Sequence, residues 1–470
     1  MADSASIRFL GAAASVTGSR FLVTLGRMRV LVDCGMFQEP ELEPRNIEPF
    51  PVDPSTIDAV VITHGHLDHC GYLPRLVRDG FRGPVWCTPA TGEIAEIIWR
   101  DAARIAAADY AHAQRARRRG HGRGAGVEPA EPPYSVNDVQ RTLRLIQPVE
   151  YDEPERIGTA LMLTFRDAGH ILGAASAHLE WREGSERLRL LFSGDLGRAN
   201  RPILHDPAPP LAAEYVVVES TYGDRLHPEG DIETLLAQVV NDTVERGGAV
   251  IIPSFAVQRS QEVLYHLRRL IEAERIPPLP VFLDSPMATA VTTLFRRYTH
   301  LLDDDVARQF DRARSPFTFP MLKVCETADD SRAINDIHGS FIVIAGSGMC
   351  EGGRVLHHLL HHLDQPESTV LFVGFQAPGT LGRRIVDGAG QVEVLGRRVT
   401  VSARIRAIEE FSAHADRDQV TAWLRQIPAP PRRVFVAHGT PESSEAFRDH
   451  LVSVTGWDAY TPSYDEAITL

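Results

Sequence analysis

Cysteine is scarce in this sequence. There are five cysteines in 470 residues, and no two of them form a Cys-x-x-Cys pair. Isolated cysteines suit free thiols in a reducing compartment, whereas small secreted domains that rely on disulfides are rich in cysteine. The cysteine pattern therefore argues against a disulfide framework and predicts a cytoplasmic location.

Long apolar runs are also missing. No stretch approaches the roughly 20 apolar residues that a bilayer-spanning helix needs. The first ten residues, MADSASIRFL, lack the basic region followed by an apolar region that a secretory signal has. We therefore expect neither membrane insertion nor secretion.

Positive charge is outnumbered by negative charge. There are 49 Lys and Arg residues against 62 Asp and Glu residues, which gives a formal net charge of −13. Such a chain repels polyanions as a whole, so a nucleic-acid partner would have to be held by local cations. The length of 470 residues and a hydrophobic content of 43% provide enough material for two to four packed domains.

The first two hundred residues are rich in short strands and poor in long helices. Residues 21–25 and 28–33 flank a turn at Gly26 and have the alternating pattern of a β-hairpin. Residues 57–63 have the pattern of a more buried strand. Further strands are expected at 160–165, 176–181 and 187–193.

The pattern changes after a proline-rich break at 207–214. Three strand–turn–helix units follow, at 249–274, 280–298 and 340–363. Tandem units of this kind imply a parallel sheet with right-handed crossover helices, and therefore a separate α/β domain. The chain then returns to strands at 368–375, 398–408 and 432–439, and ends with a helix at 442–454.

An arginine-rich segment stands apart from both regions. Its arginines are interleaved with histidines and glycines and are followed by the proline-rich EPAEPP; they are Arg115, Arg117, Arg118, Arg119 and Arg123. We expect a loop or a frayed helix end here. Two interpretations stay open, namely a basic lip that offsets the acidic total and a surface loop without a binding role.

The strongest local signal is THGHLDHCG at 63–71, directly after the apolar strand. His64 and His66 are two residues apart, so both imidazoles project to one face of an extended segment. Asp68 and His69 follow where a helix is expected to begin. Three imidazoles and one carboxylate within six residues supply the nitrogen and oxygen donors that zinc prefers.

A metal ion needs more ligands than one loop supplies. His170 in RDAGHILGAA and Asp195 in LFSGDLGR both follow apolar strands and have small residues around them. A β-scaffold presents side chains at an open rim in this way. Either residue alone could be an ordinary loop residue. Together with the histidine loop they predict a metal site.

The motifs HGHLDH, AGHILGAA, SGDLG, ESTYG, FSAHAD and VAHG, in this order, resemble the metallo-β-lactamase superfamily and specifically its β-CASP nucleases. These nucleases include the cleavage subunit of the eukaryotic pre-mRNA 3′-end machinery and prokaryotic ribonucleases. The resemblance implies an α/β fold, in which an αββα sandwich is interrupted by an inserted α/β cassette with a parallel sheet. We expect the metallo-β-lactamase domain at 1–208 and 392–470, and the β-CASP domain at 209–391.

The resemblance also implies two zinc ions per chain. The positions that match its ligands form two sets bridged by Asp195, which are His64, His66 and His170 for one ion and Asp68, His69 and His438 for the other. Asp33, at the end of strand 28–33, matches a residue that orients the ligand loop. A carboxylate behind a ligand fixes the tautomer of an imidazole, so this role is physically reasonable.

The chemistry that the resemblance implies is hydrolysis of a phosphodiester. Two zinc ions roughly 3.5–4 Å apart would hold a bridging hydroxide and polarise a phosphoryl oxygen, because bound water ionises near pH ~7. His414 in FSAHAD matches the family's proposed general acid, and Glu219 in ESTYG matches its partner. A carboxylate beside an imidazole raises the pKa of the imidazole, so Glu219 would keep His414 protonated near neutral pH.

The resemblance favours RNA as the substrate. His438 in VAHG occupies a position that is His in RNA-processing members and aliphatic in the DNA-directed branch. The expected function is therefore a zinc-dependent ribonuclease, either an endonuclease or a 5′–3′ exonuclease. Two alternatives stay open, a hydrolase of small esters or thioesters and a catalytically inactive RNA-binding relative. A homodimer is expected from base rates alone.

A glycine-rich turn, AGSGMCEGGR at 345–354, is the candidate contact for the RNA backbone. Small residues at a helix N-terminus leave backbone N–H groups open, and such ends attract phosphate. The candidate contacts in this turn and in FQAPGTLGRRI are Ser347, Gly348, Arg354, Arg383 and Arg384. A packing turn and a solvated helix face are the alternatives.

The chain departs from the family's pattern at two positions. Gln258 stands where relatives commonly have glycine, and Thr440 stands where glutamate is common. Neither residue matches a ligand, so these departures leave the predicted chemistry intact.

Overall fold

The structure is a computed structural model that describes residues 5–118, 131–311 and 315–470. Contacts divide the chain into two compact units. Unit 1 comprises Met1–Ala199, Asp206–Arg225 and His414–Leu470, and unit 2 comprises Asn200–His205 and Leu226–Ala413.

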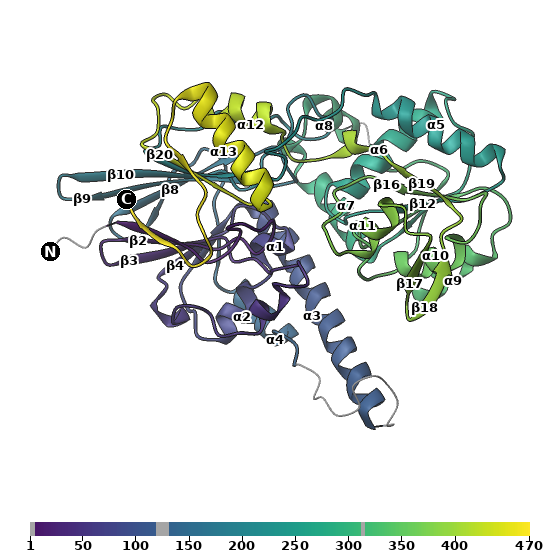
Figure 1. Cartoon of the computed structure of the whole chain (residues 1–470), viewed down its shortest axis with the longest axis horizontal. Coiled ribbons are helices and arrows are strands. Elements are labelled where there is room, and N and C mark those ends of the chain that lie inside the picture. The colour runs from purple at the N-terminus through teal and green to yellow at the C-terminus, as the bar shows by residue number, and fades with distance from the viewer. Residues whose placement is uncertain (1–4, 119–130, 312–314) are drawn as a thin grey trace. The chain divides into compact units, whose positions relative to one another are not determined.

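Unit 1 contains two seven-stranded mixed sheets (Figure 1). In the first sheet the strand order is β22 (Ala467–Thr469), β1 (Ser6–Phe9), β2 (Phe21–Leu25), β3 (Met28–Val32), β4 (Ala59–Val61), β5 (Val85–Cys87) and β6 (Ile146–Pro148). In the second sheet the order is β21 (Ala459–Tyr460), β20 (Arg433–Ala437), β11 (Tyr215–Glu219), β10 (Glu186–Phe192), β9 (Ala175–Glu183), β8 (Leu161–Asp167) and β7 (Glu155–Ile157).

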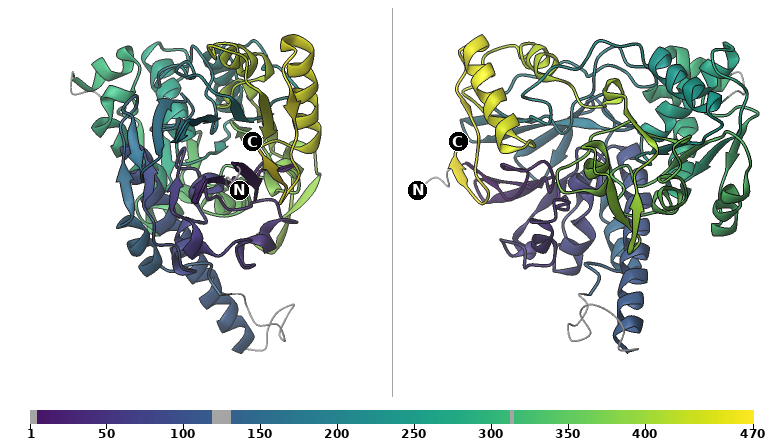
Figure 2. Two further views of the ribbon diagram at one scale, coloured as in Figure 1. Left: turned by 90° about the vertical axis from the view of Figure 1, so that its left-hand side faces the viewer. Right: turned by 45° about the vertical axis from the view of Figure 1, so that its right-hand side comes forward.

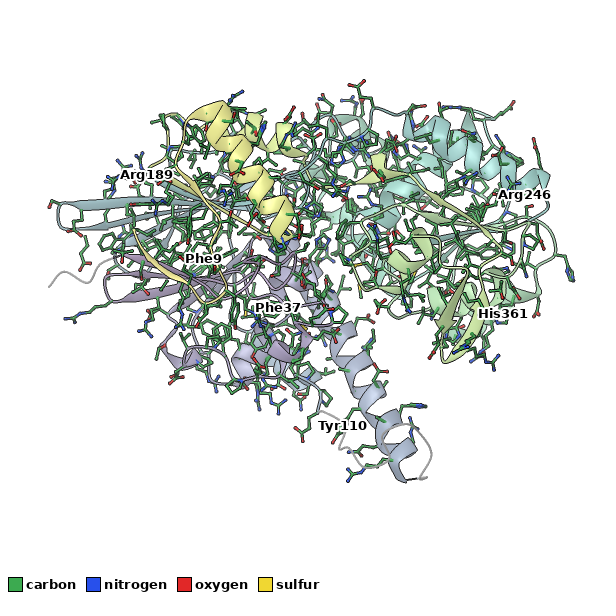
Figure 3. All side chains as sticks on the ribbon, viewed as in Figure 1. Phe9, Phe37, Tyr110, Arg189, Arg246 and His361 are labelled. Carbon is green, nitrogen blue, oxygen red and sulfur yellow. The ribbon has the colours of Figure 1, made fainter. Side chains whose placement is uncertain are left out.

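The two sheets of unit 1 pack on each other through one apolar core. Alternate residues of β8 (Leu161, Leu163 and Phe165) are fully buried and face this core, as the period of two in a strand requires. Phe9 lies between the sheets, with its ring 5.3 Å from that of Phe435 (labelled Phe9 in Figure 3).

Helices cover the outer faces of unit 1. A second apolar cluster joins the first sheet to its helices, which are α1 (Leu67–Cys70), α2 (Leu73–Arg78), α3 (Pro89–Arg118) and α4 (Val136–Leu143). The second sheet is accompanied by α12 (Arg417–Leu424) and α13 (Pro441–Thr455) (Figure 1). The layers are therefore α, β, β and α, and the predicted fold class is confirmed.

Unit 2 contains a six-stranded sheet whose pairings are all parallel. Its order is β14 (Leu322–Val324), β13 (Val281–Asp284), β15 (Ile342–Ala345), β12 (Val250–Pro253), β16 (Thr369–Phe372) and β19 (Arg404–Ala407). The four central strands are buried along their whole length. Continuous apolar strands of this kind belong to parallel sheets with both faces covered.

The sheet of unit 2 is flanked by helices of varied length. These are α5 (Ile232–Glu245), α6 (Arg259–Glu272), α7 (Pro286–Arg297), α8 (Asp304–Asp311), α9 (Ala328–Ala333), α10 (Val355–His362) and α11 (Leu381–Val386). A hairpin of β17 (Gln391–Val394) and β18 (Arg397–Thr400) adds a small separate sheet. Short 3₁₀ helices lie at Glu43–Asn46 and Pro54–Thr56 in unit 1, and at Thr299–Leu301, Ile334–Asp336 and Glu409–Phe411 in unit 2.

Two elements differ from the sequence-based expectation. α3 has 30 residues, and its last residues, 112–118, are the described part of the segment expected to be a loop or a frayed helix end, so this part is a helix end and not a loop. Alanine, arginine and glutamine have high helix propensity, which explains a helix without a strong apolar stripe. Figures 1 and 2 show its C-terminal half extending away from the sheets of unit 1. Arg119 and Arg123 lie outside the described residues.

The second difference concerns residues 398–408, which were expected to form one strand. They form β18 and β19 instead, and β19 pairs with β16 in the sheet of unit 2. Among the described residues, no helix is long and apolar enough to cross a membrane.

Candidate metal centre

The predicted ligands all follow the carboxyl ends of strands in unit 1. The HGHLDH loop follows β4, His170 follows β8, Asp195 follows β10 and His438 follows β20. Within the second sheet β10, β11 and β20 are parallel neighbours, so their carboxyl ends meet at one rim. The topology thereby gathers residues that lie hundreds of positions apart in the sequence.

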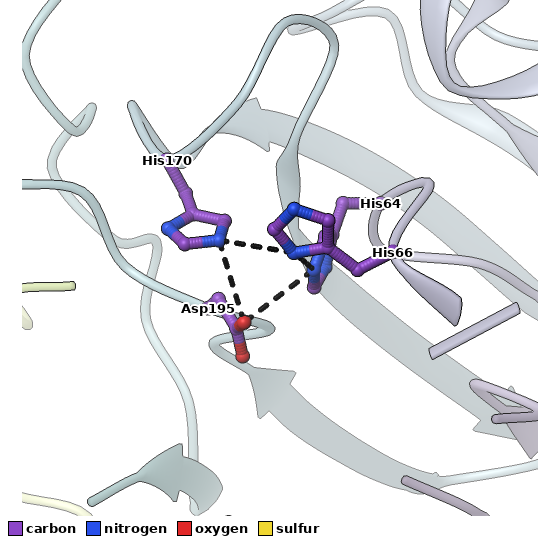
Figure 4. A group of neighbouring side chains, drawn as sticks. All are labelled: His64, His66, His170 and Asp195. Carbon is purple, nitrogen blue, oxygen red and sulfur yellow. Dashed lines mark hydrogen bonds and ion pairs between the residues drawn. The ribbon is translucent and has the colours of Figure 1, made fainter. Parts of the chain in front are cut away.

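The first group of ligand candidates consists of three histidines and one aspartate (Figure 4). The Nδ1 atom of His66 lies 3.1 Å from Nε2 of His64 and 3.3 Å from Nε2 of His170. Asp195 Oδ2 lies 3.4 Å from His64 Nε2 and 3.5 Å from His170 Nε2. Zinc–nitrogen bonds of about 2.0–2.1 Å in a tetrahedron put ligand atoms about 3.3 Å apart, so the four atoms fit a zinc ion.

The second group faces the other oxygen of Asp195. His69 Nε2 and His438 Nε2 are 3.0 Å apart, and His438 Nε2 lies 3.4 Å from Asp68 Oδ2. Asp195 Oδ1 lies 3.2 Å from His69 Nε2 and 3.6 Å from His438 Nε2. One carboxylate thus presents one oxygen to each group, which is the arrangement expected of a ligand that bridges two cations.

The charge state of these groups also suits cations. Burial, with His69 nearby, lowers the pKa of His64 to about 3, and burial lowers the pKa of His66 to about 4. Burial opposes ionisation of Asp195, but the surrounding histidines outweigh it and hold the pKa of its carboxyl well below the usual value. The buried Asp195 Oδ1 has no hydrogen-bond partner among the described residues. In the second group, burial lowers the pKa values of His69 and His438, but the carboxylates around them outweigh burial and raise both. The neutral imidazoles of the first group and the anionic, unsatisfied carboxylate are a donor set for metal ions.

Hydrogen bonds behind the ligands aim three imidazoles into the site. Asp33 Oδ2 accepts from His69 Nδ1 at 2.8 Å and also accepts from the Thr63 hydroxyl. Because the Thr63 hydroxyl donates to Asp33, its oxygen is free to accept from His64 Nδ1, 3.1 Å away. Thr221 Oγ1 lies 3.1 Å from His438 Nδ1 in the same way. Each Nδ1 therefore carries the proton, which leaves the lone pair of each Nε2 for a metal ion.

Sequence reasoning identified Asp33 but missed Thr63 and Thr221. Thr63 directly precedes the first histidine of the loop, and Thr221 lies in the ESTYG motif two residues after Glu219. A hydroxyl beside a candidate ligand was the available signal in both cases. The role of such a residue depends on which imidazole nitrogen it faces, which a sequence does not show.

Replacing Thr221 with valine is expected to weaken zinc binding by about 10–100-fold, because the variant leaves His438 Nδ1 without its acceptor. Competition with a chromogenic chelator measures this affinity. Thr221→Ser retains the hydroxyl and serves as the matched control. Wild-type affinity in the valine variant would show that this contact does not orient the ligand.

The backbone around the site is packed unusually closely. Asp33 (φ 58°) and His438 (φ 52°) both adopt the left-handed conformation that most side chains avoid. A Cβ at Gly35 would lie 1.6 Å from the carbonyl oxygen of Asp68, so only glycine fits there. Strained residues at a site persist when the surrounding structure holds them, and here they hold the ligands at fixed positions.

His414 and Glu219 form a pair beside the first ligand group. His414 Nδ1 lies 3.1 Å from Glu219 Oε2 and 3.8 Å from Asp195 Oδ2. Burial lowers the pKa of His414, but the carboxylates of Glu219 and Asp195 outweigh burial and raise this pKa to about 9. The ring of His414 also lies 4.6 Å from that of His170. The structure thus places beside the first ligand group an imidazole whose protonated form is favoured by two carboxylates.

The candidate RNA contacts of unit 2 lie in different surroundings, some of them exposed and others engaged in contacts within unit 2. The hydroxyl of Ser347 accepts from the backbone N–H groups of Glu351 and Gly352, and so closes its own turn. Arg384 is exposed. Arg383 is exposed and forms an ion pair with Asp387 at 2.8 Å.

Gly348 and Arg354 are held by the surrounding structure. A Cβ at Gly348 would come within 2.7 Å of the ring of Phe255. The guanidinium of Arg354 lies 2.6 Å from the buried carboxylate of Asp284, which also contacts His358 at 2.7 Å. Arg354 therefore anchors the glycine-rich turn to the end of β13.

Three family models match successive segments of the chain. Residues 18–244 match the metallo-beta-lactamase superfamily, residues 260–385 match the Beta-Casp domain, and residues 398–462 match the Zn-dependent metallo-hydrolase RNA specificity domain. Ribonuclease TTHA0252 of Thermus thermophilus is 39% identical over 459 residues, which cover 97% of this chain and 98% of that protein. This chain belongs to the β-CASP family of the metallo-β-lactamase superfamily.

Other relatives agree with this membership. The transcription termination factor FttA of Methanosarcina mazei is 32% identical to this β-CASP protein over 443 residues, which cover 92% of this chain and 66% of that protein. A crystal structure of a protein of unknown function from Enterococcus faecalis V583 superposes with a TM-score of 0.53 and 14% identity, and covers 99% of this chain and 100% of that chain. The latter similarity concerns the fold alone.

Proposed function

We propose that this β-CASP protein is a zinc-dependent ribonuclease that hydrolyses RNA phosphodiester bonds. One observation carries the proposal, namely that the two oxygens of Asp195 face two separate groups of donors, most of which are buried. We assign His64, His66 and His170 to one zinc ion, and Asp68, His69 and His438 to a second one. When bound, zinc lowers the pKa of water to about 7 and polarises a phosphoryl oxygen.

Other residues of the chain orient the ligands and supply the proton for the leaving oxygen. Asp33, Thr63 and Thr221 hold imidazole rings in the orientation that ligands require. His414 delivers a proton to the leaving oxygen, because Glu219 stabilises its protonated form. Glu219 is itself fixed, since its Oε1 accepts from the backbone N–H of Leu196 at 2.6 Å.

RNA is the substrate that the sequence matches favour. The segment 398–462 matches an RNA specificity domain of zinc-dependent metallohydrolases, and the relative from Thermus thermophilus is a ribonuclease. A small ester or thioester would have no use for the additional α/β domain, and an inactive relative would not need the complete donor set. We also propose a cytoplasmic location and a homodimer.

Labelled single-stranded RNA tests the proposal directly. Wild-type protein is expected to cleave it, and a chelator or the His66→Ala substitution is expected to abolish cleavage. His361→Ala is the matched control, because His361 is exposed on α10 and belongs to neither ligand group (labelled in Figure 3). Cleavage that survives the chelator, or that His66→Ala leaves unchanged, would contradict the proposal.

The mode of cleavage follows from the products. RNA with a 5′-hydroxyl, monophosphate or triphosphate is incubated with the enzyme, and the product ends are mapped. Internal cuts that do not depend on the 5′ group indicate an endonuclease, whereas mononucleotides released from one 5′ state indicate a 5′–3′ exonuclease.

A further inference from the structure

The C-terminal half of α3 is a helical arm that the metal centre does not explain. We call residues Arg104–Arg117 the α3 arm. Ile94, Trp99 and Ala103 in the first half of the helix are buried, whereas none of the described side chains of the arm is buried. Because none of these side chains is buried, the core of unit 1 does not depend on the arm. An isolated helix of this length is only marginally stable in water.

The helix that carries the α3 arm packs against the metal-binding loop at its other end. Gly65, between His64 and His66, packs so closely on α3 that a Cβ there would lie 2.5 Å from Ile94 Cγ2. Successive residues of an α-helix are rotated by about 100° around its axis. Five residues of the arm point in nearly the same direction as Ile94, within a sector of roughly 100°. They are Arg104, Ile105, Ala108, His112 and Arg115, and all five are exposed. The face that touches the ligand loop therefore continues along the arm and is open to solvent.

The charge on this face is positive, in a chain with a net charge of −13. Arg100, one turn before the arm, is neutralised by Glu96 at 2.7 Å. Within the described part of the chain, Arg104 and Arg115 form no ion pair, and the guanidinium of Arg115 donates only to the carbonyl oxygen of Ala111. Asp109, the acidic residue of the arm, lies about 140° away from Arg104 around the helix.

The acidic residue nearest to Arg104 in the sequence is Asp101, one turn before it. Burial raises the pKa of its carboxyl and the Arg104 guanidinium lowers it, although the two side chains form no ion pair within the described part of the chain. Arg104 also lines an open cavity of about 510 Å³ beside α3. The two carboxylates in its lining are engaged elsewhere, Glu131 with Arg78 at 3.5 Å and Asp138 with the backbone N–H of Ser135 at 2.9 Å.

We propose that the exposed face of the α3 arm binds the backbone of a single-stranded RNA whose cleaved bond lies at the metal centre. This proposal rests on the proposed function and adds a second contact region to it. Arginines separated by small alanines let a strand approach the helix closely while each guanidinium pairs with a phosphate. A second copy of the chain is a less suitable partner, because two such faces would bring arginines together.

The length of the arm sets the length of RNA that can use it. From Ile94 to Arg104 the helix rises about 15 Å, and from Ile94 to Arg115 about 32 Å. A stacked strand rises about 3.4 Å per nucleotide, so Arg115 lies about nine nucleotides from the loop. An RNA of 20 nucleotides can therefore reach both arginines, and one of four nucleotides cannot span to Arg115.

The test is the double substitution Arg104→Gln/Arg115→Gln. Glutamine has nearly the helix propensity of arginine, so the arm keeps its structure while it loses two charges. Binding of fluorescent 20-nucleotide RNA is measured by anisotropy against salt, in a His414→Ala background. Two lost phosphate contacts are expected to reduce the slope of log K against log salt by about 1.4, and to weaken binding roughly 25-fold at 0.1 M salt.

Controls separate this contact from the catalytic site. Cleavage is measured with the double variant that retains His414, and four-nucleotide RNA is expected to keep its wild-type kcat/KM. Arg182→Gln/Arg187→Gln, on exposed arginines of β9 and β10, is expected to leave the salt slope unchanged. An unchanged slope for 20-nucleotide RNA, or equal losses for both lengths, would overturn the proposal. So would a dimer that the double variant dissociates. Binding without any cleavage by wild type would contradict only the proposed function.

Discussion

Replacing Asp195 with asparagine is expected to lower the rate of RNA cleavage by about 10³–10⁴-fold. The two carboxylate oxygens face different ligand groups, and the amide nitrogen of asparagine cannot coordinate a cation. The variant also loses the negative charge that balances the cations. Lewis-acid stabilisation by a metal supplies several kcal/mol, and about 1.4 kcal/mol corresponds to a factor of ten in rate.

Zinc content and single-turnover cleavage measured on the same sample test this expectation. Asp195→Asn should lose zinc as well as activity, because the two oxygens of Asp195 face the two ligand groups. Asp167→Asn is a useful control, because Asp167 precedes the His170 loop but belongs to neither group. Cleavage within a factor of ten of the wild-type rate, with full zinc content, would show that Asp195 is not the bridge.

Replacing His414 with alanine is expected to lower the rate of RNA cleavage by about 10²–10⁴-fold while zinc binding is preserved. His414 is outside the two ligand groups, and its Nδ1 lies 3.1 Å from Oε2 of Glu219, whose carboxylate favours the protonated imidazole. Without it, the leaving alkoxide must depart unprotonated. Glu219→Gln should have a smaller effect in the same direction, because the imidazole remains but its protonated form is less stable.

A substrate with a good leaving group distinguishes the general acid from a structural residue. Bis-p-nitrophenyl phosphate releases a nitrophenolate that needs little protonation, so His414→Ala should hydrolyse it at nearly the wild-type rate. Equal losses with RNA and with the nitrophenyl ester would place His414 in ligand positioning or folding. Unimpaired RNA cleavage would remove it from the mechanism.

Patterns of apolar residues predicted much of the architecture. The alternation in 21–33 gave the β2–β3 hairpin, and the three strand–turn–helix units gave the parallel sheet of unit 2. The length of α3 was missed because its second half has no apolar stripe, and the pattern there shows only residues of high helix propensity. β19 was missed as a separate strand because it pairs with β16, which lies about 35 residues earlier in the chain, and the local sequence pattern does not show this pairing.

The residues that could bind a metal were visible in the sequence, but the hydrogen bonds that orient their imidazole rings were not. The order of motifs suggested which histidines and aspartates belong together, and the strand ends bring them to one rim. The orientation of each imidazole depends on hydrogen bonds such as that of Thr221 with His438, across 217 positions of sequence. Arg354 was predicted to contact RNA, and its buried partner Asp284 lies 70 positions away.

The two departures from the family's pattern have local explanations. Gln258 directly precedes α6 and has a φ of 64°, a conformation in which glycine is ordinarily favoured, and its side chain is buried. Thr440 caps α13, where its side chain accepts from the backbone N–H of Ser443.

Anomalous diffraction at the zinc absorption edge, on crystals grown with zinc, tests the central claim most directly. We expect two peaks roughly 3.5–4 Å apart, the distance typical of two-metal hydrolases, with one oxygen of Asp195 beside each. One peak should be bound by His64, His66 and His170, and the other by Asp68, His69 and His438. A single peak, or zinc bound outside these residues, would contradict a two-zinc centre.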